Sequence, residues 1–453
     1  MTANTVFLQE LPYQPDSCAV FERIRDLPGA VFLDSSFPHC QAGRYDIITA
    51  DPVHTESIKL STSNSYDAVV NSFEEQRQLH RELFGGISAP AEDLPFYGGV
   101  AGHLPYEAGK PLQHLPTSNA AAGQLGYYLW SVVQDHLRQR CTFAALPALP
   151  QRQREQLLRA LRQPLISKPK PFQLQEDFSS NFSATSYRDA FRSIQRYILQ
   201  GDCYQVNLAQ RFSADYEGDA WSAYRLLRPL AAAPFAGFMQ LSDGEQLLCL
   251  SPERFLSLHG HTVETRPIKG TRPRHADPGA DALSANELRH SPKDRAENLM
   301  IVDLLRNDLG RSCVAGSIHV EKLFELESFP TVHHLVSTIK GELLPDRDAY
   351  TLLRDCFPGG SITGAPKRRS MEIIEELEPD QRRAYCGSLF YISPDGRMDS
   401  NIAIRTLQTQ ASKMLCWGGG GIVADSNWER EYQETFDKVG TFLSALEATQ
   451  ATE

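Results

Sequence analysis

The 453-residue sequence predicts a soluble protein of the α/β or α+β class with large, partly antiparallel sheets. Segments with strand-like patterns occur both in clusters and between helices, which is typical of such sheets. The composition, with 41% hydrophobic and 22% charged residues, excludes collagen-like, low-complexity and disordered classes. The net charge of −11 and the lack of a long basic run argue against a nucleic-acid or anionic-membrane binder. A locally basic pocket for a small anionic substrate stays compatible with this charge.

The nine cysteines are scattered, odd in number and free of any C-x-x-C pair. This pattern disfavours a disulfide framework and a structural zinc site. The first residues lack a basic segment followed by an apolar one, so we expect no secretory signal. No apolar run approaches the ~20 residues of a membrane-spanning helix. We therefore expect a protein of a reducing compartment, in the cytoplasm.

Three regions follow one another along the chain: 1–165, a linker over 166–182, and 183–447. The boundary is indicated by leucines at helical spacing (Leu157, Leu161) followed by a run rich in proline and lysine. Hydrophobic patterns predict strands at 30–33, 45–50, 127–134, 235–241, 246–251 and 262–265, and helices over 66–84 and 185–200. A further helix is expected to begin after Ser291, because proline follows it and aspartate stands three residues on.

Two short motifs carry candidate reactive groups. In SPERF, Glu253 follows an apolar run, where a carboxyl group with a raised pKa can act as a general acid. In RPIKGTRPR, Lys269 stands among Arg266, Arg272 and Arg274, and neighbouring cations or burial would free its amine for nucleophilic attack. A surface ion pair and a solvated basic loop are the alternative interpretations.

Two helical patterns each carry a glutamate apart from their apolar residues. Glu297 lies in a helix whose stripe is Leu299, Val302 and Leu305, and Glu434 in a helix over 429–448. The stripe of the second helix is Tyr432, Phe436, Val439, Leu443 and Leu446. Two such glutamates suit an Mg²⁺ ion shared with an anionic substrate, and they equally suit two solvated helix faces.

Glycine-rich segments mark candidate anion sites. Residues 357–379 run from a glycine turn into a helix near Pro366, which suits an anion but lacks the G-K-[ST] ending of a nucleotide loop. Four consecutive glycines from Gly418 let a carboxylate approach backbone amides closely. Arg405, expected in a strand, could bind a carboxylate through a bidentate ion pair.

Together, these motifs resemble the chorismate-utilising enzymes over 185–446. The resemblance rests on GDCYQVNLAQRF (201–212), PIKGT (267–271), DRAENLMIVDLLRNDLGR (294–311), FPTVHHLVSTIKG (329–341), FPGGSITGAPK (357–367), IAIRT (402–406), GGGIVADS (419–426) and EYQETFDKV (431–439). It implies one interwoven unit in which two antiparallel sheets are sandwiched and helices lie outside. Residues 1–165 resemble the family's first region more weakly.

The resemblance also implies roles for residues. Mg²⁺ would be held by Glu297 and Glu434, while Glu253 would protonate the departing 4-hydroxyl and Lys269 would attack C2 of chorismate. His334 matches a family active-site histidine. The implied substrate-binding residues are Thr271, Thr363, Tyr385, Arg405, Gly419, Gly420, Gly421 and Lys438.

Lys269 indicates the branch of the family. The form PIKGT is typical of the members that make 4-amino-4-deoxychorismate for 4-aminobenzoate and folate, whereas anthranilate synthases carry PIAGT. Isochorismate and salicylate synthases use a lysine in an earlier motif, where Gln205 or a neighbour in DCYQVN stands here. No G-x-C-x-G surrounds any cysteine, so a glutamine amidotransferase partner would supply the ammonia. The alternatives are an anthranilate synthase component I and a non-catalytic family subunit.

A second pocket is implied in the first region, where relatives bind tryptophan. The matching residues are Ser35, Ala42, Gly43, Arg44, Tyr45, Phe235, Ala236 and Gly237. Asp34 replaces the glutamate of the family's LLES-type motif. The pocket therefore either holds tryptophan or has lost it.

Overall fold

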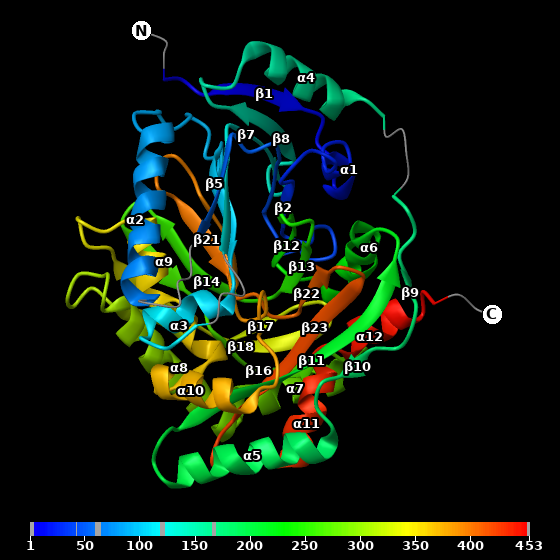
Figure 1. The fold of residues 1–453 in the computed structure, drawn as a ribbon, viewed down its shortest axis with the longest axis vertical. Helices are drawn as coiled ribbons and strands as arrows, with labels where there is room; N and C mark the ends of the chain where they lie inside the picture. The colour runs from blue at the N-terminus through cyan, green and yellow to red at the C-terminus, as the bar shows by residue number, and fades with distance from the viewer. Residues whose placement is uncertain (1–3, 42, 59–64, 118–122, 165–168, 451–453) are drawn as a thin grey trace.

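The computed structural model describes residues 4–41, 43–58, 65–117, 123–164 and 169–450, which form two large sheets with helices around them (Figure 1). All pairings between the named strands are antiparallel, as predicted. The first sheet has 13 strands. Its order is β1 (Phe7–Leu11), β8 (Arg140–Ala145), β7 (Trp130–Asp135), β3 (Tyr45–Thr49), β2 (Val31–Asp34), β12 (Phe235–Gln240), β13 (Gln246–Ser251), β22 (Thr406–Gln410), β23 (Lys413–Ile422), β11 (Gln205–Glu217) and β10 (Ser179–Ser180), with β9 (Gln173–Leu174) and β19 (Gly364–Ala365) also paired to β11.

The second sheet has 10 strands. Its order is β16 (Ile268–Pro273), β18 (Val332–Glu342), β15 (Thr262–Thr265), β14 (Arg254–His259), β21 (Met398–Asn401), β20 (Ser388–Ile392), β5 (Gly99–Leu104), β6 (Gly123–Tyr128) and β4 (His54–Ile58), with β17 (His319–Ser328) paired to β18. Each sheet joins a block of strands from the first part of the chain to a block from the later part, where β2 pairs with β12 and β5 with β20. The linker expected over 166–182 contains β9 and β10, and its residues 166–168 lie outside the described ranges.

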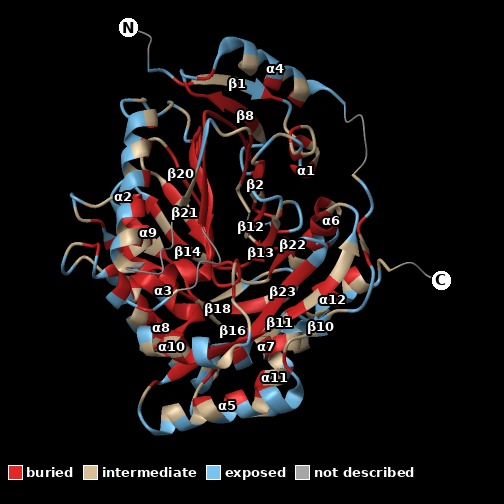
Figure 2. Cartoon of the chain, in the orientation of Figure 1, coloured by how far each residue is buried: buried red, intermediate tan, exposed pale blue. Residues whose placement is uncertain are grey.

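Helices cover the outer faces of both sheets. Helix α11 (Trp428–Asp437) packs on β23, and α8 (Pro292–Leu309) packs on β16 and β18. The others are α1 (Cys18–Phe21), α2 (Ser65–Phe84), α3 (Gly109–Leu112), α4 (Gln151–Arg162), α5 (Ala184–Leu199), α6 (Ala220–Ala231), α7 (Pro278–His290), α9 (Ala349–Cys356), α10 (Lys367–Leu377) and α12 (Gly440–Glu447), with short 3₁₀ turns η1 (Tyr106–Ala108) and η2 (Gly360–Ile362). Figure 2 shows the sheets buried and the outward faces of α2, α4 and α5 exposed. None of the described helices is both long and apolar enough to span a bilayer.

Helix α8 begins as predicted but buries a different face. Ser291 caps it by accepting a hydrogen bond from the backbone N–H of Asp294 at 3.3 Å. Leu299, expected in the apolar stripe, is 47% exposed, whereas Ile301 is fully buried with Val302 and Leu305. The stripe was displaced because α8 packs on β16 and β18 through its Ile301 side.

Two further predictions were wrong in detail. The strand expected over 127–134 is two strands in different sheets, β6 and β7, with Leu129 between them. The helix expected over 429–448 is broken after Asp437 into α11 and α12, although Val439, Leu443 and Leu446 are buried as expected. In both cases a short connection turns the chain from one packing surface to another, which hydrophobic periodicity does not reveal.

Candidate active site

Lys269 lies on β16 at the edge of the second sheet, where the strand is irregular. The pairing with β18 shifts register between Ile268 and Thr271, and Gly270 has a φ of 83°. Such a bulge changes the direction of the side chains beside it. The Lys269 Nζ donates a hydrogen bond to the carbonyl oxygen of Ser361 at 3.0 Å. Burial lowers the pKa of Lys269, although the charges of Glu297 and Glu253 oppose this shift.

The three arginines near Lys269 in the sequence are turned toward carboxylates. Their ion pairs are Arg266–Glu327, Arg272–Asp294 and Arg274–Asp281. The expectation that they depress the pKa of Lys269 is therefore wrong, because each positive charge is already balanced. The cation that lowers this pKa most is Lys438, which comes from the end of α11.

Glu253 follows β13 and is buried, with 5% of its surface exposed. Its backbone is held on both sides, because its N–H donates to the Ser251 hydroxyl at 3.1 Å and its carbonyl accepts from Ile402 N at 3.0 Å. Burial raises the pKa of the Glu253 carboxyl, while the charge of Lys269 and a hydrogen bond from the Ser361 side chain lower it. A raised pKa keeps a carboxyl group available as a proton donor.

Glu297 on α8 and Glu434 on α11 come from helices on different sheets. Burial raises the pKa of Glu297, and the charges of Asp294 and Glu434 act in the same direction. Lys438 lowers the pKa of Glu434 through an ion pair of 2.7 Å between its Nζ and Glu434 Oε1. The two glutamates therefore act on each other electrostatically across the space between the helices.

Two residues that the sequence analysis does not single out, Lys293 and Glu431, lie beside these two glutamates. The Lys293 Nζ lies 3.9 Å from Glu297 Oε1 and 3.8 Å from Glu431 Oε1. Their signal in the sequence is helical spacing, since Lys293 precedes Glu297 by one turn and Glu431 precedes Glu434 by three residues.

The carboxylates fit an Mg²⁺ ion only if a bound anion adds further oxygen ligands. Among the described residues, no group of three or more His, Cys, Asp and Glu side chains is arranged to hold a metal by itself. Carboxylate oxygens are nevertheless the ligands that Mg²⁺ prefers, and it commonly binds through one or two of them together with a substrate. The Lys293 ammonium lies within 4 Å of two of these carboxylates, so a cation already occupies their surroundings.

The glycines after Gly418 form part of β23 and pair with β11, with Gly419 opposite Ala209 and Gly421 opposite Asn207. A Cβ on Gly419 would come within 2.7 Å of the Tyr385 hydroxyl, and one on Gly420 within 3.2 Å of Glu431 Oε2. Glycine is needed here because α11 and Tyr385 approach the strand closely. Beyond Cys416, β22 no longer pairs with β23. One edge of β23 therefore has no pairing with β22 beside the glutamates.

Arg405 was expected in a strand but lies in the connection between β21 and β22, with a left-handed φ of 50°. The chain passes from the second sheet to the first at this point, which explains why the strand ends. Within the described part of the chain Arg405 has no carboxylate partner, and burial lowers its pKa. A strained residue with an unpaired guanidinium is typical of an anion-binding position.

His334 on β18 lies close to Arg405 and opposite Thr271 of β16. Its Nδ1 is 2.9 Å from the Thr271 hydroxyl. Burial and then the charge of Arg405 lower the pKa of His334 to about 3, so the ring is neutral at physiological pH. Thr271 follows Lys269 by two residues on β16, at the end of the shift in register.

The other expected residues line the same region. Thr363, fully buried, donates its hydroxyl to the Gly359 carbonyl at 3.2 Å, and Lys438 donates to the Gly419 carbonyl at 2.8 Å. Gln205 is fully buried, and neither polar atom of its amide has a hydrogen-bond partner among the described residues. We call Glu253, Lys269, Glu297, Arg405 and Glu434, with their surroundings, the lysine site.

A cavity of about 280 Å³ lies between the two sheets. Of the residues expected there, those that line it are Ser35, Gly43, Arg44, Tyr45, Phe235 and Ala236. Gly237 is not among the lining residues, and Ala42 lies outside the described ranges. We call this space the inter-sheet cavity.

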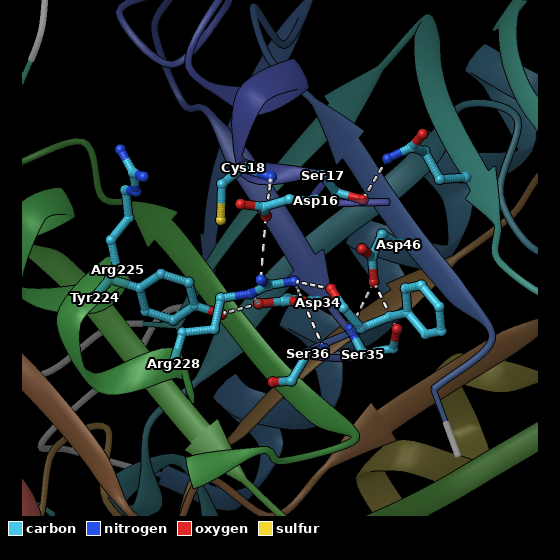
Figure 3. Close-up of polar contacts among 12 residues, drawn as sticks. Asp16, Ser17, Cys18, Asp34, Ser35, Ser36, Asp46, Tyr224, Arg225 and Arg228 are labelled. Atoms are coloured by element: carbon cyan, nitrogen blue, oxygen red, sulfur yellow. Dashed lines mark hydrogen bonds and ion pairs between the residues drawn. The ribbon is translucent and has the colours of Figure 1, made fainter. Parts of the chain in front are cut away.

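A network of buried charges holds the strand end that lines this cavity (Figure 3). Asp34 accepts hydrogen bonds from Arg228 Nε at 2.6 Å and from the Tyr224 hydroxyl at 2.7 Å. Asp46 accepts from the Ser35 hydroxyl at 2.7 Å and contacts His136 Nε2 at 2.8 Å. Despite burial, Asp34 raises the pKa of Arg228, and His136 lowers that of Asp46. We call these residues the cavity network.

Comparison with known proteins agrees with this arrangement. The family model for "chorismate binding enzyme" matches residues 38–444. The aminodeoxychorismate synthase component 1 of Salmonella typhimurium is 45% identical over 448 residues, which are 96% of this chain and 97% of that protein. The anthranilate synthase component 1 of Streptomyces coelicolor is 36% identical over 80% of this chain and 76% of that protein.

Among solved structures, the anthranilate synthase component I of Streptococcus pneumoniae superposes with a TM-score of 0.75 and 30% identity. The match covers 88% of this chain and 92% of that one. The predicted fold of two large antiparallel sheets with outer helices is thereby confirmed.

Proposed function

The chain belongs to the chorismate-binding enzyme family, and we propose that it is component 1 of an aminodeoxychorismate synthase, which converts chorismate and ammonia to 4-amino-4-deoxychorismate. The observation that carries this proposal is the amine of Lys269. It projects from a strand bulge beside a buried carboxyl group, with a lowered pKa. The higher identity to an aminodeoxychorismate synthase component than to an anthranilate synthase component, 45% against 36%, supports the same branch.

In the proposed reaction, Arg405, Tyr385 and the amides of Gly419–421 bind the enolpyruvyl carboxylate of chorismate. Arg405 is suited to this role because its guanidinium has no competing carboxylate in the described structure. Thr271, Thr363 and Lys438 complete the contacts. His334, neutral at working pH, offers a hydrogen bond rather than a charge.

The chemical steps use two side chains. Glu253 gives its proton to the 4-hydroxyl, which leaves as water while the Lys269 nitrogen forms a bond to C2 and the double bond shifts. Ammonia then bonds to C4, the double bond shifts back, and the C2–N bond to Lys269 breaks, which restores the amine. A covalent intermediate divides one difficult displacement into two easier ones.

Mg²⁺ would be held by Glu297 and Glu434, with Glu431 and Lys293 around them. When bound, the ion would neutralise and orient the anionic substrate. The mutual charge effect of the two glutamates and the oxygen donor set support this assignment.

The ammonia would come from a glutamine amidotransferase subunit, in a heterodimer. All nine cysteines of this chain are buried free thiols, so none is placed as an accessible nucleophile for glutamine. The purified chain should therefore turn over with ammonium and not with glutamine, and an added amidotransferase subunit should restore glutamine use. Equal rates with glutamine and ammonium in the chain alone would contradict this.

The decisive test is product identification with chorismate, Mg²⁺ and ammonium. We expect 4-amino-4-deoxychorismate by liquid chromatography and mass spectrometry, without pyruvate release. Anthranilate and pyruvate would instead identify an anthranilate synthase component. Chorismate binding without any product would identify a non-catalytic subunit.

For the inter-sheet cavity we propose bound tryptophan. The volume of about 280 Å³ and the pairing of aromatic Tyr45 and Phe235 with polar Ser35 and Arg44 support an amino acid with a large ring. Calorimetric titration with tryptophan, with phenylalanine as control, tests the binding. Absence of binding to protein shown to be free of tryptophan contradicts it, and an effect on turnover would distinguish regulation from a structural role.

A further inference from the structure

Lys293 joins two carboxylates that come from helices on different sheets. Its Nζ lies 3.9 Å from Glu297 Oε1, one turn further along α8, and 3.8 Å from Glu431 Oε1 on α11. In the described structure this is the ion pair that connects α8 to α11. The ammonium is therefore close both to a proposed metal ligand, Glu297, and to its acidic neighbour Glu431.

The carboxylates around this ammonium are held close together. Ser426 donates its hydroxyl to Glu431 Oε1 at 2.7 Å, and the Glu431 side chain is 5% exposed. A Cβ on Gly420 would lie 3.2 Å from Glu431 Oε2 and 3.5 Å from Glu434 Oε1, so both carboxylates lie over the same residue of β23. Like charges at this spacing repel one another, so the group needs nearby cations.

Two lysines supply those cations, and they are held differently. Lys438 is fixed by its ion pair with Glu434 at 2.7 Å and by its hydrogen bond to the Gly419 carbonyl at 2.8 Å. Lys293 donates no hydrogen bond among the described residues, and half of its side chain is exposed. Because an exposed ion pair contributes little to stability, Lys293 can leave the carboxylates at low cost.

We propose that Lys293 is a displaceable counter-ion, whose ammonium balances Glu297 and Glu431 when no metal is bound and moves into solvent when Mg²⁺ binds. The inference rests on the proposed function, from which it takes the assignment of Mg²⁺ to Glu297 and Glu434. A positive charge 3.9 Å from a proposed ligand competes with the divalent ion, so Lys293 lowers the affinity of the chain for the metal. A bound anionic substrate adds negative charge, which favours the exchange, so metal and substrate bind together.

The test measures metal affinity with no substrate present. Mn²⁺ serves as the probe, because carboxylate ligands suit it as they suit Mg²⁺ and electron paramagnetic resonance detects the free ion. Lys293→Met should bind Mn²⁺ about 5- to 10-fold more tightly than the wild type, because the repulsion between the ammonium and the ion is removed. Lys293→Arg, which keeps the charge, should stay within about twofold of the wild type.

Thermal unfolding provides a second readout, in which the effect of the substitution depends on the metal. Without metal, Lys293→Met should melt at a lower temperature than the wild type, since Glu297 and Glu431 lose a counter-ion. With saturating Mn²⁺ it should melt at the same or a higher temperature, since an ion that binds the folded chain more tightly stabilises it more.

Lys413→Met is the matched control, because the Lys413 side chain is equally exposed and pairs with Asp215 at 3.1 Å, at the other end of β23. Its Mn²⁺ affinity should equal that of the wild type. An unchanged or lower Mn²⁺ affinity in Lys293→Met overturns the inference, and so does equal tightening in Lys293→Arg or Lys413→Met. Binding that persists undiminished in Glu297→Gln, or no binding to any variant, contradicts the metal assignment of the proposed function instead.

Discussion

The lysine site and the cavity network both place a cationic side chain inside the protein, but Lys269 and Arg228 differ in their partners. In the cavity network, Arg228 and Asp34 meet through two hydrogen bonds, at 2.6 and 3.0 Å. In the lysine site, the amine of Lys269 donates to a neutral carbonyl and has no carboxylate within ion-pair distance among the described residues.

The pKa shifts of Arg228 and Lys269 follow this difference. In the cavity network close partners raise the pKa of Arg228 and lower that of Asp46, although burial raises the pKa of Asp34 despite its pairing with Arg228. In the lysine site burial lowers the pKa of Lys269 and raises those of Glu253 and Glu297, whereas the charge of Lys438 lowers that of Glu434. Buried charges with complete partners therefore indicate structure, whereas incompletely compensated ones indicate chemistry.

The largest expected effect concerns Lys269. Chorismate and Mg²⁺ without ammonia should add the mass of chorismate minus water to the peptide that contains Lys269, and ammonium should remove it. Lys269→Met should abolish the adduct and lower formation of the 4-amino product at least about 10³-fold. Its free energy of unfolding should stay the same or rise, because an incompletely compensated charge is removed. Peptide mass spectra and chemical denaturation measure the two effects.

Lys269→Arg is the control for charge alone. A guanidinium stays protonated and cannot attack, so this variant should be as inactive as Lys269→Met. Near-normal turnover in Lys269→Met, without an adduct in the wild type, would leave direct attack by ammonia as the better model.

Replacement of the buried cation of the cavity network by methionine should lower the stability of the fold instead. Arg228→Met leaves the buried Asp34 carboxylate without its partner, so the free energy of unfolding should fall by about 3–5 kcal/mol. Adduct formation by the folded fraction should persist. Denaturation of Arg225→Met is the control, because Arg225 is a half-exposed neighbour on α6 that pairs with Glu22 at 2.8 Å. Equal stability of the two variants would remove the contrast between the regions.

As the pH falls, His334 should lower the free energy of unfolding at a higher pH than the cavity network does. Its pKa is about 3 in the folded chain and about 6.5 when unfolded, so the unfolded state binds more protons between these values and stability falls with pH from about 6.5 downward. Asp46, with a lowered pKa, adds stability that is lost only below about pH 4. His334→Gln should reduce the loss of unfolding free energy between pH 6.5 and 4.5 by about 2 kcal/mol.

Denaturant titrations across this pH range provide the measurement. His259→Gln, at an exposed position on β14, is the matched control and should follow the wild-type curve. A His334→Gln curve parallel to that of the wild type would show that the ring is not held neutral by burial.

The smallest expected effect concerns the metal. Glu297→Gln or Glu434→Gln should each raise the Mg²⁺ concentration for half-maximal activity about 10-fold, since each removes a charged ligand. Both should also weaken the dependence of the melting temperature on Mg²⁺. Asp303→Asn, on the same helix as Glu297 but paired with Arg306, is the control. Unchanged Mg²⁺ dependence in either glutamate variant would contradict the ligand assignment.

Sequence alone was sufficient where a property depends on neighbours along the chain. The start of α8 at Ser291, the strand β13 at Gln246–Ser251 and the helix α2 at Ser65–Phe84 follow from local capping and periodicity. Glu253 and Lys269 became candidates because each stands in a short motif, and Glu297 and Glu434 because each lies on a helix apart from its apolar residues. The resemblance of these motifs to one family then predicted the architecture of two sheets.

Only the tertiary structure decided which charges meet. Arg266, Arg272 and Arg274 stand beside Lys269 in sequence, yet each is turned to a carboxylate, and the cation that acts most on Lys269 is Lys438 from the other sheet. Arg405 lies outside its expected strand because the chain changes sheets there, and Lys269 donates to the Ser361 carbonyl, 92 residues further along the chain. Electrostatic and hydrogen-bond partners depend on distances in space. Strand order and helix packing set these distances, and the order of residues along the chain does not reveal them.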